Sequence, residues 1–318
     1  MNPGDVGAVM AEEKVWNAEE FWDDISGEPL DPAGVYKARK EETGEVHKHK
    51  VYEKVPLTEC WDKTGKGPIG IRWVDVNKGY KVHPEYRSRL VVKEIKINKR
   101  EDLFAATPPL EALKILLSLA MTEEIGWNKT RGHIKKVDFI DIRRAYFHAA
   151  AIREIYVDLP PENHEEGKCG RLLQSMYGTR DAAQNWEAAY TEFLKEAGFT
   201  HGKASPCIFY NSEQDIRVVI HGDDFTILAE EEKLEWFRKK IQSKFEIKFR
   251  GRMGADPQDM KSIRILNRIV TWTKEGIEYE ADQRHAEIIV KTMGLTPECR
   301  THDTPSSKPD KQDIKDEK

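Results

Sequence analysis

The chain has 318 residues, of which 39% are hydrophobic and 34% are charged, and its formal net charge is −5. This length suits one large or two modest domains, and the acidic balance argues against a surface that binds nucleic acid throughout. Four scattered cysteines exclude a disulfide framework and a cysteine-based metal site. The sequence shows neither a signal peptide nor a membrane-spanning stretch, which predicts an intracellular protein of the cytoplasm or nucleus without a membrane partner.

The first 50 residues are predicted to be largely irregular. Residues 1–15 are small, polar and acidic, which is typical of disorder. Residues 16–22 place Trp and Phe among acidic residues and predict a short amphipathic helix. Residues 24–50 combine Gly, Pro and many charges with little periodicity, and we predict a loop there.

Two strands are predicted at 69–77 and 88–97, joined by a polar connection. The second strand is locally basic, with Glu85 and Glu94 as its only opposing charges. Such a patch is either a solvated strand face or a surface that holds phosphate groups through charge-assisted hydrogen bonds. Its cationic residues are Lys81, Arg87, Arg89, Lys93, Lys96, Lys99 and Arg100.

The central part of the chain begins with a helix after Thr107, whose leucines repeat at helical spacing and indicate a core face. A strand is predicted at 136–143. Asp138 and Asp141 are separated by an odd number of residues, so they lie on opposite faces of a regular strand. Further strands are predicted at 155–159, 171–176, 206–210 and 217–220, with helices at 180–197, 230–245 and 283–293 and a hairpin at 269–281.

Residues 218–228 read as a tight β-hairpin, because two apolar, β-branched runs flank a short polar turn. The turn carries the adjacent acids Asp223 and Asp224. Adjacent carboxylates repel each other unless a cation lies between them, so the pair is a candidate site for a hard metal ion. Because Asp also favours turns in general, a solvated acidic turn is the alternative.

The order and spacing of these segments resemble the reverse transcriptase of copia-type LTR retrotransposons, over about residues 16–305. The basic strand matches the family's fingers segment, and a second match is the first catalytic motif. Two further matches lie before a helix that contains Trp186. The last match is the turn of the hairpin that carries Asp223 and Asp224. The matching stretches are RSRLVVK at 87–93, DIRRAYF at 141–147, IYVDLPP at 155–161, MYG at 176–178 and HGDD at 221–224.

The resemblance implies an α+β fold of the right-hand polymerase type, with fingers, palm and thumb and an antiparallel palm sheet. The reverse transcriptase domain would span 51–300, with fingers and palm at about 60–230 and a thumb-like region at about 230–300. Residues 301–318, rich in Pro, Ser, Lys and Asp, are predicted to form a disordered tail.

The resemblance also implies RNA-directed DNA polymerase activity through two-metal nucleotidyl transfer onto a primer 3′-hydroxyl. Asp141, Asp223 and Asp224, with the backbone carbonyl of Ile142, would hold two Mg²⁺ ions, or Mn²⁺ in their place. These oxygen ligands favour such ions over zinc. The partners would be dNTPs and a primer on an RNA or DNA template.

Other residues receive roles from the same resemblance. Arg89 and Lys93 would clamp the triphosphate of the incoming nucleotide. Tyr146 would stack under its sugar and exclude a 2′-hydroxyl. Gly178 and Arg180 would lie near the templating base or the template backbone. Asp138 would be structural and face away.

Three departures from the family pattern bear on activity. His221-Gly222 precedes the paired acids, residues 179–186 lack the family's Gln-Ala-Pro-Arg, and Glu94 stands where the family has Gly. A glycine is expected to loosen the hairpin, and Glu94 to add negative charge near the triphosphate. The alternative is therefore a catalytically inactive remnant that at most binds nucleic acid. A two-metal nuclease ranks last, and the length indicates a fragment of a longer polyprotein or a decaying copy.

Overall fold

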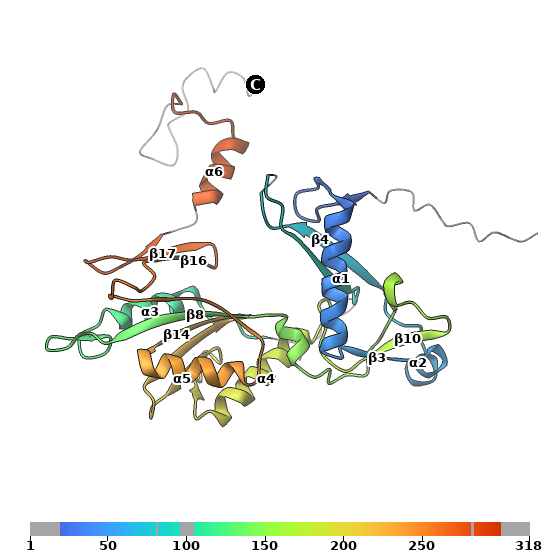
Figure 1. The fold of residues 1–318 in the computed structure, drawn as a ribbon, viewed down its shortest axis with the longest axis horizontal. Helices are drawn as coiled ribbons and strands as arrows, with labels where there is room; N and C mark the ends of the chain where they lie inside the picture. Colours follow the sequence, from blue (N-terminus) through green and yellow to red (C-terminus); the bar gives the residue numbers. More distant parts are fainter. Residues whose placement is uncertain (1–19, 81, 96–104, 281–282, 300–318) are drawn as a thin grey trace, which may run out of the picture. The chain divides into compact units, whose positions relative to one another are not determined.

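The computed structural model of the protein describes residues 20–80, 82–95, 105–280 and 283–299. The chain divides into two compact units, Met1–Arg252 and Met253–Lys318 (Figure 1). The predicted disordered ends lie outside the described residues, as does most of the helix predicted at 16–22. The last two residues of that predicted helix form a strand instead, β1 (Phe21–Trp22), which pairs with β2 (Pro29–Leu30).

The first unit is built on a six-stranded sheet with the strand order β11-β12-β13-β14-β8-β15. The pairs from β11 to β8 are antiparallel, which confirms the predicted antiparallel sheet. Its long strands are rich in β-branched and aromatic residues, which suit a buried pleated surface. The strands are β8 (Lys135–Ile142), β11 (Thr200–His201), β12 (Ile208–Asn211), β13 (Ile216–His221), β14 (Asp224–Glu230) and β15 (Ile247–Met253).

Helices cover both faces of this sheet. The helices α4 (Ala182–Glu196) and α5 (Glu231–Gln242) lie together on one side, and α3 (Leu110–Ala120) lies on the other (Figure 1). The helix α5 was predicted within the thumb-like region, but its apolar face packs into the same core as α4. The second unit begins only at Met253.

Alternation along the strands decides which side chains reach these helices. Ile140 and Ile142 of β8 share a core cluster with Phe225 of β14 and with residues of α4 and α5. Asp141, which lies between the two isoleucines, therefore points to the opposite face, whereas Asp138 shares the face of Ile140. The prediction that Asp138 and Asp141 lie on opposite faces follows from this register and is confirmed.

Asp138 is a structural residue, as predicted. Its carboxylate accepts hydrogen bonds from Nε and Nη2 of Arg252 on β15, at 2.7 and 2.8 Å. Burial raises the pKa of Asp138, and the Arg252 guanidinium opposes that rise. The pair fixes β15 to β8, because removing either partner would leave an uncompensated charge in the core.

A basic strand lies in a second sheet of the first unit, where β4 (Ile71–Asn77) pairs with β5 (Tyr86–Val92) in antiparallel fashion. Both predicted strands are thus present, although β5 begins earlier and ends sooner than expected. Leu90 and Val92 are buried on one face of β5. The alternating residues Arg87 and Arg89 therefore share the other face.

A helix replaces the loop that we predicted at 24–50, so the prediction of a largely irregular N-terminal segment is wrong there. The helix α1 (Pro32–Lys48) begins at Asp31, whose side chain accepts a hydrogen bond from the backbone N of Gly34 at 2.8 Å. Pro32 at the first helical position suits the helix start. Its buried stripe contains an alanine and a glutamate between valines, which concealed the apolar periodicity.

A three-stranded sheet with the order β3-β10-β9 completes the first unit, together with short elements. None of the helices in the described parts of the chain has the length and apolar composition needed to cross a membrane. The remaining elements are β3 (Tyr52–Pro56), α2 (Leu57–Thr64), β6 (Trp127–Asn128), β7 (Gly132–His133), the 3₁₀ turn η1 (Ala145–His148), β9 (Tyr156–Val157), the 3₁₀ turn η2 (Pro161–Asn163) and β10 (Lys168–Leu172).

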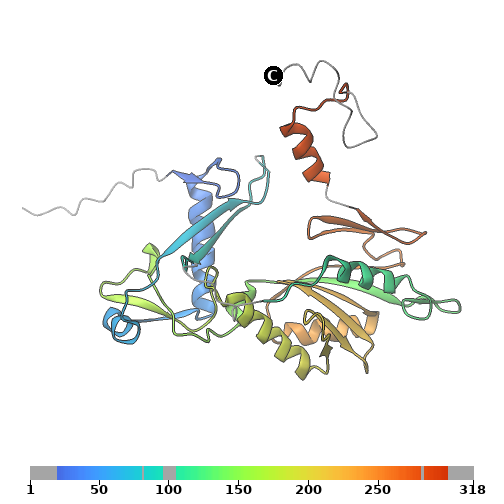
Figure 2. The ribbon, with the colours of Figure 1, turned by 180° about the vertical axis from the view of Figure 1, so that it is seen from behind.

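The second unit contains a small antiparallel sheet and a helix. The predicted hairpin is present as β17 (Arg268–Trp272) and β18 (Ile277–Glu280), and β16 (Ser262–Ile265) pairs with β17 on its other side. The predicted C-terminal helix is present as α6 (Gln283–Thr292). Figure 2 shows the same elements from behind.

Candidate active site

The hairpin between β13 and β14 has a two-residue turn, Gly222-Asp223, because His221 and Asp224 are paired across it. Gly222 has φ +64°, whereas Asp223 is not among the residues with positive φ. A glycine at the first central position is what a type II′ hairpin turn requires. Gly222 therefore fits a turn that favours glycine at this position, and a looser hairpin stays a prediction.

The sheet register brings the three predicted aspartates together. Asp224 at the start of β14 stands directly opposite Asp141 near the end of β8. The backbone N of Ile142 donates a hydrogen bond to the carbonyl of Asp223 at 2.9 Å. The two strands and the turn thus present three carboxylates at one edge of the sheet, on the face away from α4 and α5.

Burial raises the pKa of Asp141 and of Asp224, and the nearby charge of Asp223 raises both further. The Arg250 guanidinium opposes the rise at each residue. Carboxylates that disfavour one another's ionised form fit a divalent cation, which would neutralise them. The ligand set consists of oxygen atoms, so it suits Mg²⁺ or Mn²⁺.

Among the described residues, the group whose possible ligand atoms all lie within 4.8 Å of one another is Glu45, His49 and Glu246, and the three aspartates do not form such a group. Lys48 already lies between its two glutamates, with Nζ at 3.2 Å from Glu45 and 2.6 Å from Glu246. Arg144 adds a further positive charge beside Glu45. This cluster is therefore a group of ion pairs that links α1 to the start of β15. The cations within the cluster balance the charges of its acids.

Trp186 of α4 contacts the turn that carries Asp223. Its Nε1 donates a hydrogen bond to the carbonyl of Gly222 at 2.9 Å. Its ring makes edge contacts with Tyr190 and Phe245, at centroid distances of 5.5 and 5.0 Å. A buried aromatic cluster thus fixes the turn that carries Asp223. The sequence comparison had included Trp186 as part of a motif, without a role.

Two of the predicted nucleotide-binding residues meet at a residue that we did not predict, Tyr177. The guanidinium carbon of Arg89 lies 4.7 Å from the centre of the Tyr177 ring, and the Tyr146 ring lies 5.0 Å from it. Burial and the charge of Asp223 both raise the pKa of Tyr146. Arg89 and Tyr146 therefore lie beside the aspartates. In the sequence, the signal that could have identified Tyr177 is its position directly before Gly178 in the matched stretch at 176–178.

Lys93 lies just beyond the end of β5. Its backbone N donates a hydrogen bond to the carbonyl of Gly70 at 2.8 Å, and its charge lowers the pKa of Asp158, which burial raises. Lys93 is exposed and follows Arg89 by four residues, which an extended chain places on the same face. The structure thus places Lys93 next to Asp158, with no described contact to the aspartates.

Gly178 allows the chain before α4 to approach β5. It has φ +87°, and a Cβ at this position would lie 2.0 Å from the carbonyl oxygen of Val92. The backbone N of Val92 also donates a hydrogen bond to the carbonyl of Tyr177 at 2.8 Å. Gly178 is therefore required for packing, which is a role that the sequence comparison did not assign.

Glu94 carries its negative charge next to a cation, and its effect on a bound triphosphate stays a prediction. Arg153 Nη1 and Nη2 donate hydrogen bonds to its carboxylate at 2.8 and 2.9 Å. The backbone N of Arg180 donates another at 2.8 Å. Arg153 also holds Asp181 at 2.6 Å. These bonds lower the pKa of Glu94 and tie the chain after β5 to the segment before α4.

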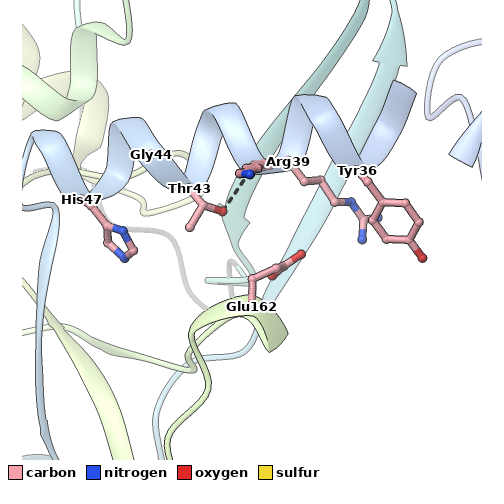
Figure 3. Close-up of a pocket in the computed structure, with 7 residues that line it drawn as sticks. Tyr36, Arg39, Thr43, Gly44, His47 and Glu162 are labelled. Atoms are coloured by element: carbon pink, nitrogen blue, oxygen red, sulfur yellow. Dashed lines mark hydrogen bonds between the residues drawn. The ribbon is translucent and has the colours of Figure 1, made fainter. Parts of the chain in front are cut away.

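A hollow of about 470 Å³ lies along the outer side of α1, away from every predicted site residue. Figure 3 shows Tyr36, Thr43 and His47 along the helix with Glu162 opposite them. Its one arginine, Arg39, is held by a 2.6 Å ion pair with Asp75, which indicates a structural role. The hollow is lined by Tyr36, Arg39, Lys40, Thr43, Gly44, His47 and Glu162.

The sequence is similar to those of known proteins. The profile of one family, Reverse transcriptase (RNA-dependent DNA polymerase), matches residues 50–305. The Retrovirus-related Pol polyprotein from transposon TNT 1-94 of Nicotiana tabacum is 26% identical over 210 residues, covering 62% of this chain and 15% of the polyprotein. The Truncated transposon Ty1-A Gag-Pol polyprotein of Saccharomyces cerevisiae is 28% identical over 93 residues, covering 29% of this chain and 8% of the polyprotein.

A solved structure of a foamy viral protease-reverse transcriptase with double-stranded DNA aligns with 83% of this chain and 37% of that one, at 14% identity and a TM-score of 0.45. The chain spans a small part of the length of the two polyproteins that it matches. The family profile covers most of the chain, including the three aspartates, Arg89 and Tyr146. The protein therefore belongs to the reverse transcriptase (RNA-dependent DNA polymerase) family, in its copia-type retrotransposon branch.

Proposed function

We propose that this chain is an RNA-directed DNA polymerase that extends a primer 3′-hydroxyl with dNTPs on an RNA or DNA template. The observation that carries the proposal is the convergence of Asp141, Asp223 and Asp224 at one sheet edge, beside Arg89 and Tyr146. These groups come from separate chain segments, so local turn chemistry does not account for their meeting. The hydrogen bond from Trp186 to the carbonyl of Gly222 supports the proposal, because it ties the turn that carries Asp223 to the core.

In this proposal the three aspartates and the carbonyl of Ile142 hold two Mg²⁺ ions. Bound ions of this kind lower the pKa of a primer hydroxyl and neutralise charge on the triphosphate. The guanidinium of Arg89 binds the triphosphate in a fixed orientation, because Tyr177 supports it from below. Lys93 adds a point charge further along the same face.

The remaining assignments concern the sugar, the template and the subdomains. Tyr146 packs under the sugar of the incoming nucleotide, where its ring would meet a 2′-hydroxyl. Gly178 and Arg180 line the path of the template. The six-stranded sheet serves as the palm, the β4–β5 sheet as fingers, and the second unit, from Met253, as a thumb-like region. We place the protein inside the cell, in the cytoplasm or nucleus.

A catalytically inactive, nucleic-acid-binding remnant is the alternative function. The observation that favours it is the ion pair between Arg250 and Asp224, with Nη1 3.2 Å from Oδ1, which occupies one carboxylate of the site. The net charge of −5 also favours weak rather than strong binding of nucleic acid by the whole surface.

Primer extension on poly(rA)/oligo(dT) with Mg²⁺ or Mn²⁺ distinguishes the two. We expect extension by the unmodified chain and its loss in Asp223→Asn, which removes one ligand charge. Asp62→Asn, at an exposed position of α2, is the matched control and should extend normally. If a folded chain that binds primer–template extends nothing with either ion, the polymerase proposal is wrong and the remnant reading stands.

A further inference from the structure

A single strand, β15, sends two arginines to opposite faces of the palm sheet. Arg252 holds Asp138 on the face covered by α4 and α5, whereas Arg250 reaches Asp224 on the other face. Residues two apart on a regular strand share a face, so the strand is irregular between them. Gly251, with φ +143°, stands at this point, and such a backbone conformation is accessible mainly to glycine.

The two ion pairs differ in burial. The side chains of Arg252 and Asp138 are 11% and 1% exposed, and two hydrogen bonds join them. The side chains of Arg250 and Asp224 are 29% and 18% exposed, and a hydrogen bond of 3.2 Å joins Nη1 of Arg250 to Oδ1 of Asp224. The first pair is part of the core. The second faces solvent at the edge where the metal ions of the proposed function would bind, so its partners can exchange.

The other charges around the aspartates do not duplicate Arg250. Arg87 from β5 and Lys248 from β15 act on Asp141 through their charge, and no hydrogen bond from either to an aspartate occurs among the described residues. Arg250 acts on both Asp141 and Asp224 and also bonds to one of them. It is therefore the cation best placed to compete with a metal ion for Asp224.

We propose that Arg250 is a tethered cation that competes with divalent metal for Asp224 and so sets the metal affinity of the site. This inference rests on the proposed function, because it requires metal binding at the aspartates. Metal binding has to displace the guanidinium from Asp224 or place a divalent charge near it. Both cost free energy, so Arg250 weakens the binding of the ion.

The sign of the effect separates this role from a merely supporting one. If Arg250 competes with the ion, its removal tightens metal binding. If Arg250 instead supports the geometry of Asp224, its removal weakens metal binding. Arg250→Gln removes the charge and keeps a long polar side chain, whereas Arg250→Lys keeps the charge and should remain close to the unmodified chain.

Binding of Mn²⁺ to the full chain, without nucleotide, is measured by the loss of the free-ion EPR signal. We expect Arg250→Gln to bind Mn²⁺ roughly three- to tenfold more tightly than the unmodified chain, with the difference shrinking as ionic strength rises. Lys240→Gln on α5, which covers the opposite face of the sheet, removes the same charge and should leave the affinity unchanged.

The outcomes keep the two proposals apart. If Mn²⁺ binding survives Asp223→Asn undiminished, the ion is not at the aspartates and both proposals are wrong. If Asp223→Asn abolishes binding but Arg250→Gln leaves it unchanged or weaker, the metal site stands and the role of Arg250 is overturned. Thermal denaturation of each variant checks folding, and Arg250→Lys covers the case in which Arg250→Gln does not fold.

Discussion

At the scale of single residues, the turn that carries Asp223 depends on a tryptophan that would contact neither nucleotide nor metal in the proposed function. Trp186 donates its indole N–H to the carbonyl of Gly222, while its ring is buried against Tyr190 and Phe245. The ring and the N–H of Trp186 therefore make different contributions. The ring contributes to the core below the sheet, and the N–H fixes the turn that positions Asp223.

Trp186→Phe separates these contributions, because phenylalanine retains most of the ring but has no N–H. We expect the loss of about 1 kcal/mol of unfolding free energy, which is typical of one hydrogen bond whose acceptor can be rehydrated. We also expect a lower rate of single-turnover nucleotide addition and a higher Mg²⁺ requirement, because Asp223 is held less firmly. Primer–template affinity should not change.

Trp186→Ala is the comparison, since it also removes the ring and should cost roughly 3–5 kcal/mol through the cavity that it leaves. Stability is measured by chemical denaturation and the rate by rapid quench. A Trp186→Phe chain that adds nucleotides at the unmodified rate and at the same Mg²⁺ concentration would contradict a positioning role for the N–H.

The hairpin pattern marked Asp223 and Asp224, which stand between two apolar runs, as a candidate metal site. The family resemblance then selected Asp141 over Asp138, and the strand register brings Asp141 opposite Asp224. The metal-binding roles of the three stay predictions. No pattern in the sequence marks Arg250 as part of the site. Its contact with Asp224 depends on how β15 docks beside β8, and a register between distant strands leaves no local signal.

At the scale of elements, Gly178 controls the junction between the β4–β5 sheet and the helix α4. A side chain there would meet backbone, since an added Cβ lies 2.0 Å from the carbonyl oxygen of Val92. Gly178→Ala should therefore separate the segment before α4 from β5. We expect a loss of more than about 3 kcal/mol of unfolding free energy, because positive φ and a backbone clash act together.

Gly167→Ala is the matched control. Gly167 also has positive φ, +72°, but an added Cβ there would meet nothing within 4 Å. The expected cost is about 1 kcal/mol, from backbone strain alone. Equal losses in the two variants, measured by urea denaturation, would show that the close approach to Val92 contributes nothing.

The helix α1 shows why some elements escape prediction from sequence. Its cap, Asp31-Pro32, is a recognised helix start, but the buried stripe that follows includes Ala38 and Glu42. Glu42 is buried because Arg144, from the segment after β8, donates a hydrogen bond to it at 2.9 Å. A charged residue at a core position can be recognised as buried only when its distant partner is known.

At the scale of the whole molecule, an acidic chain carries a basic strand next to its site. The net charge is −5, yet Arg87 and Arg89 share one face of β5. We expect primer–template binding to weaken as salt rises, because phosphate contacts release counterions. Arg87→Gln, at an exposed position of β5, should reduce the slope of log K against log salt by about one, which corresponds to one lost phosphate contact.

The control for this measurement is Lys195→Gln on α4, which lies on the face of the palm sheet away from the aspartates. It removes the same charge and should leave the slope unchanged. Fluorescence anisotropy with a labelled primer–template, over a range of salt concentrations, gives both slopes. If the two variants have the same slope, Arg87 makes no phosphate contact in the complex.

The pairing of β8 with β14 also has a consequence for how the protein folds. Asp141 and Asp224 are direct neighbours in the sheet, although all of β9 to β13 lies between them in the chain. Closing so long a loop costs entropy that local contacts do not offset, so such pairings form slowly. During synthesis the site cannot begin to assemble until β14 has left the ribosome, so a nascent chain that stops short of Asp224 lacks the paired aspartates altogether.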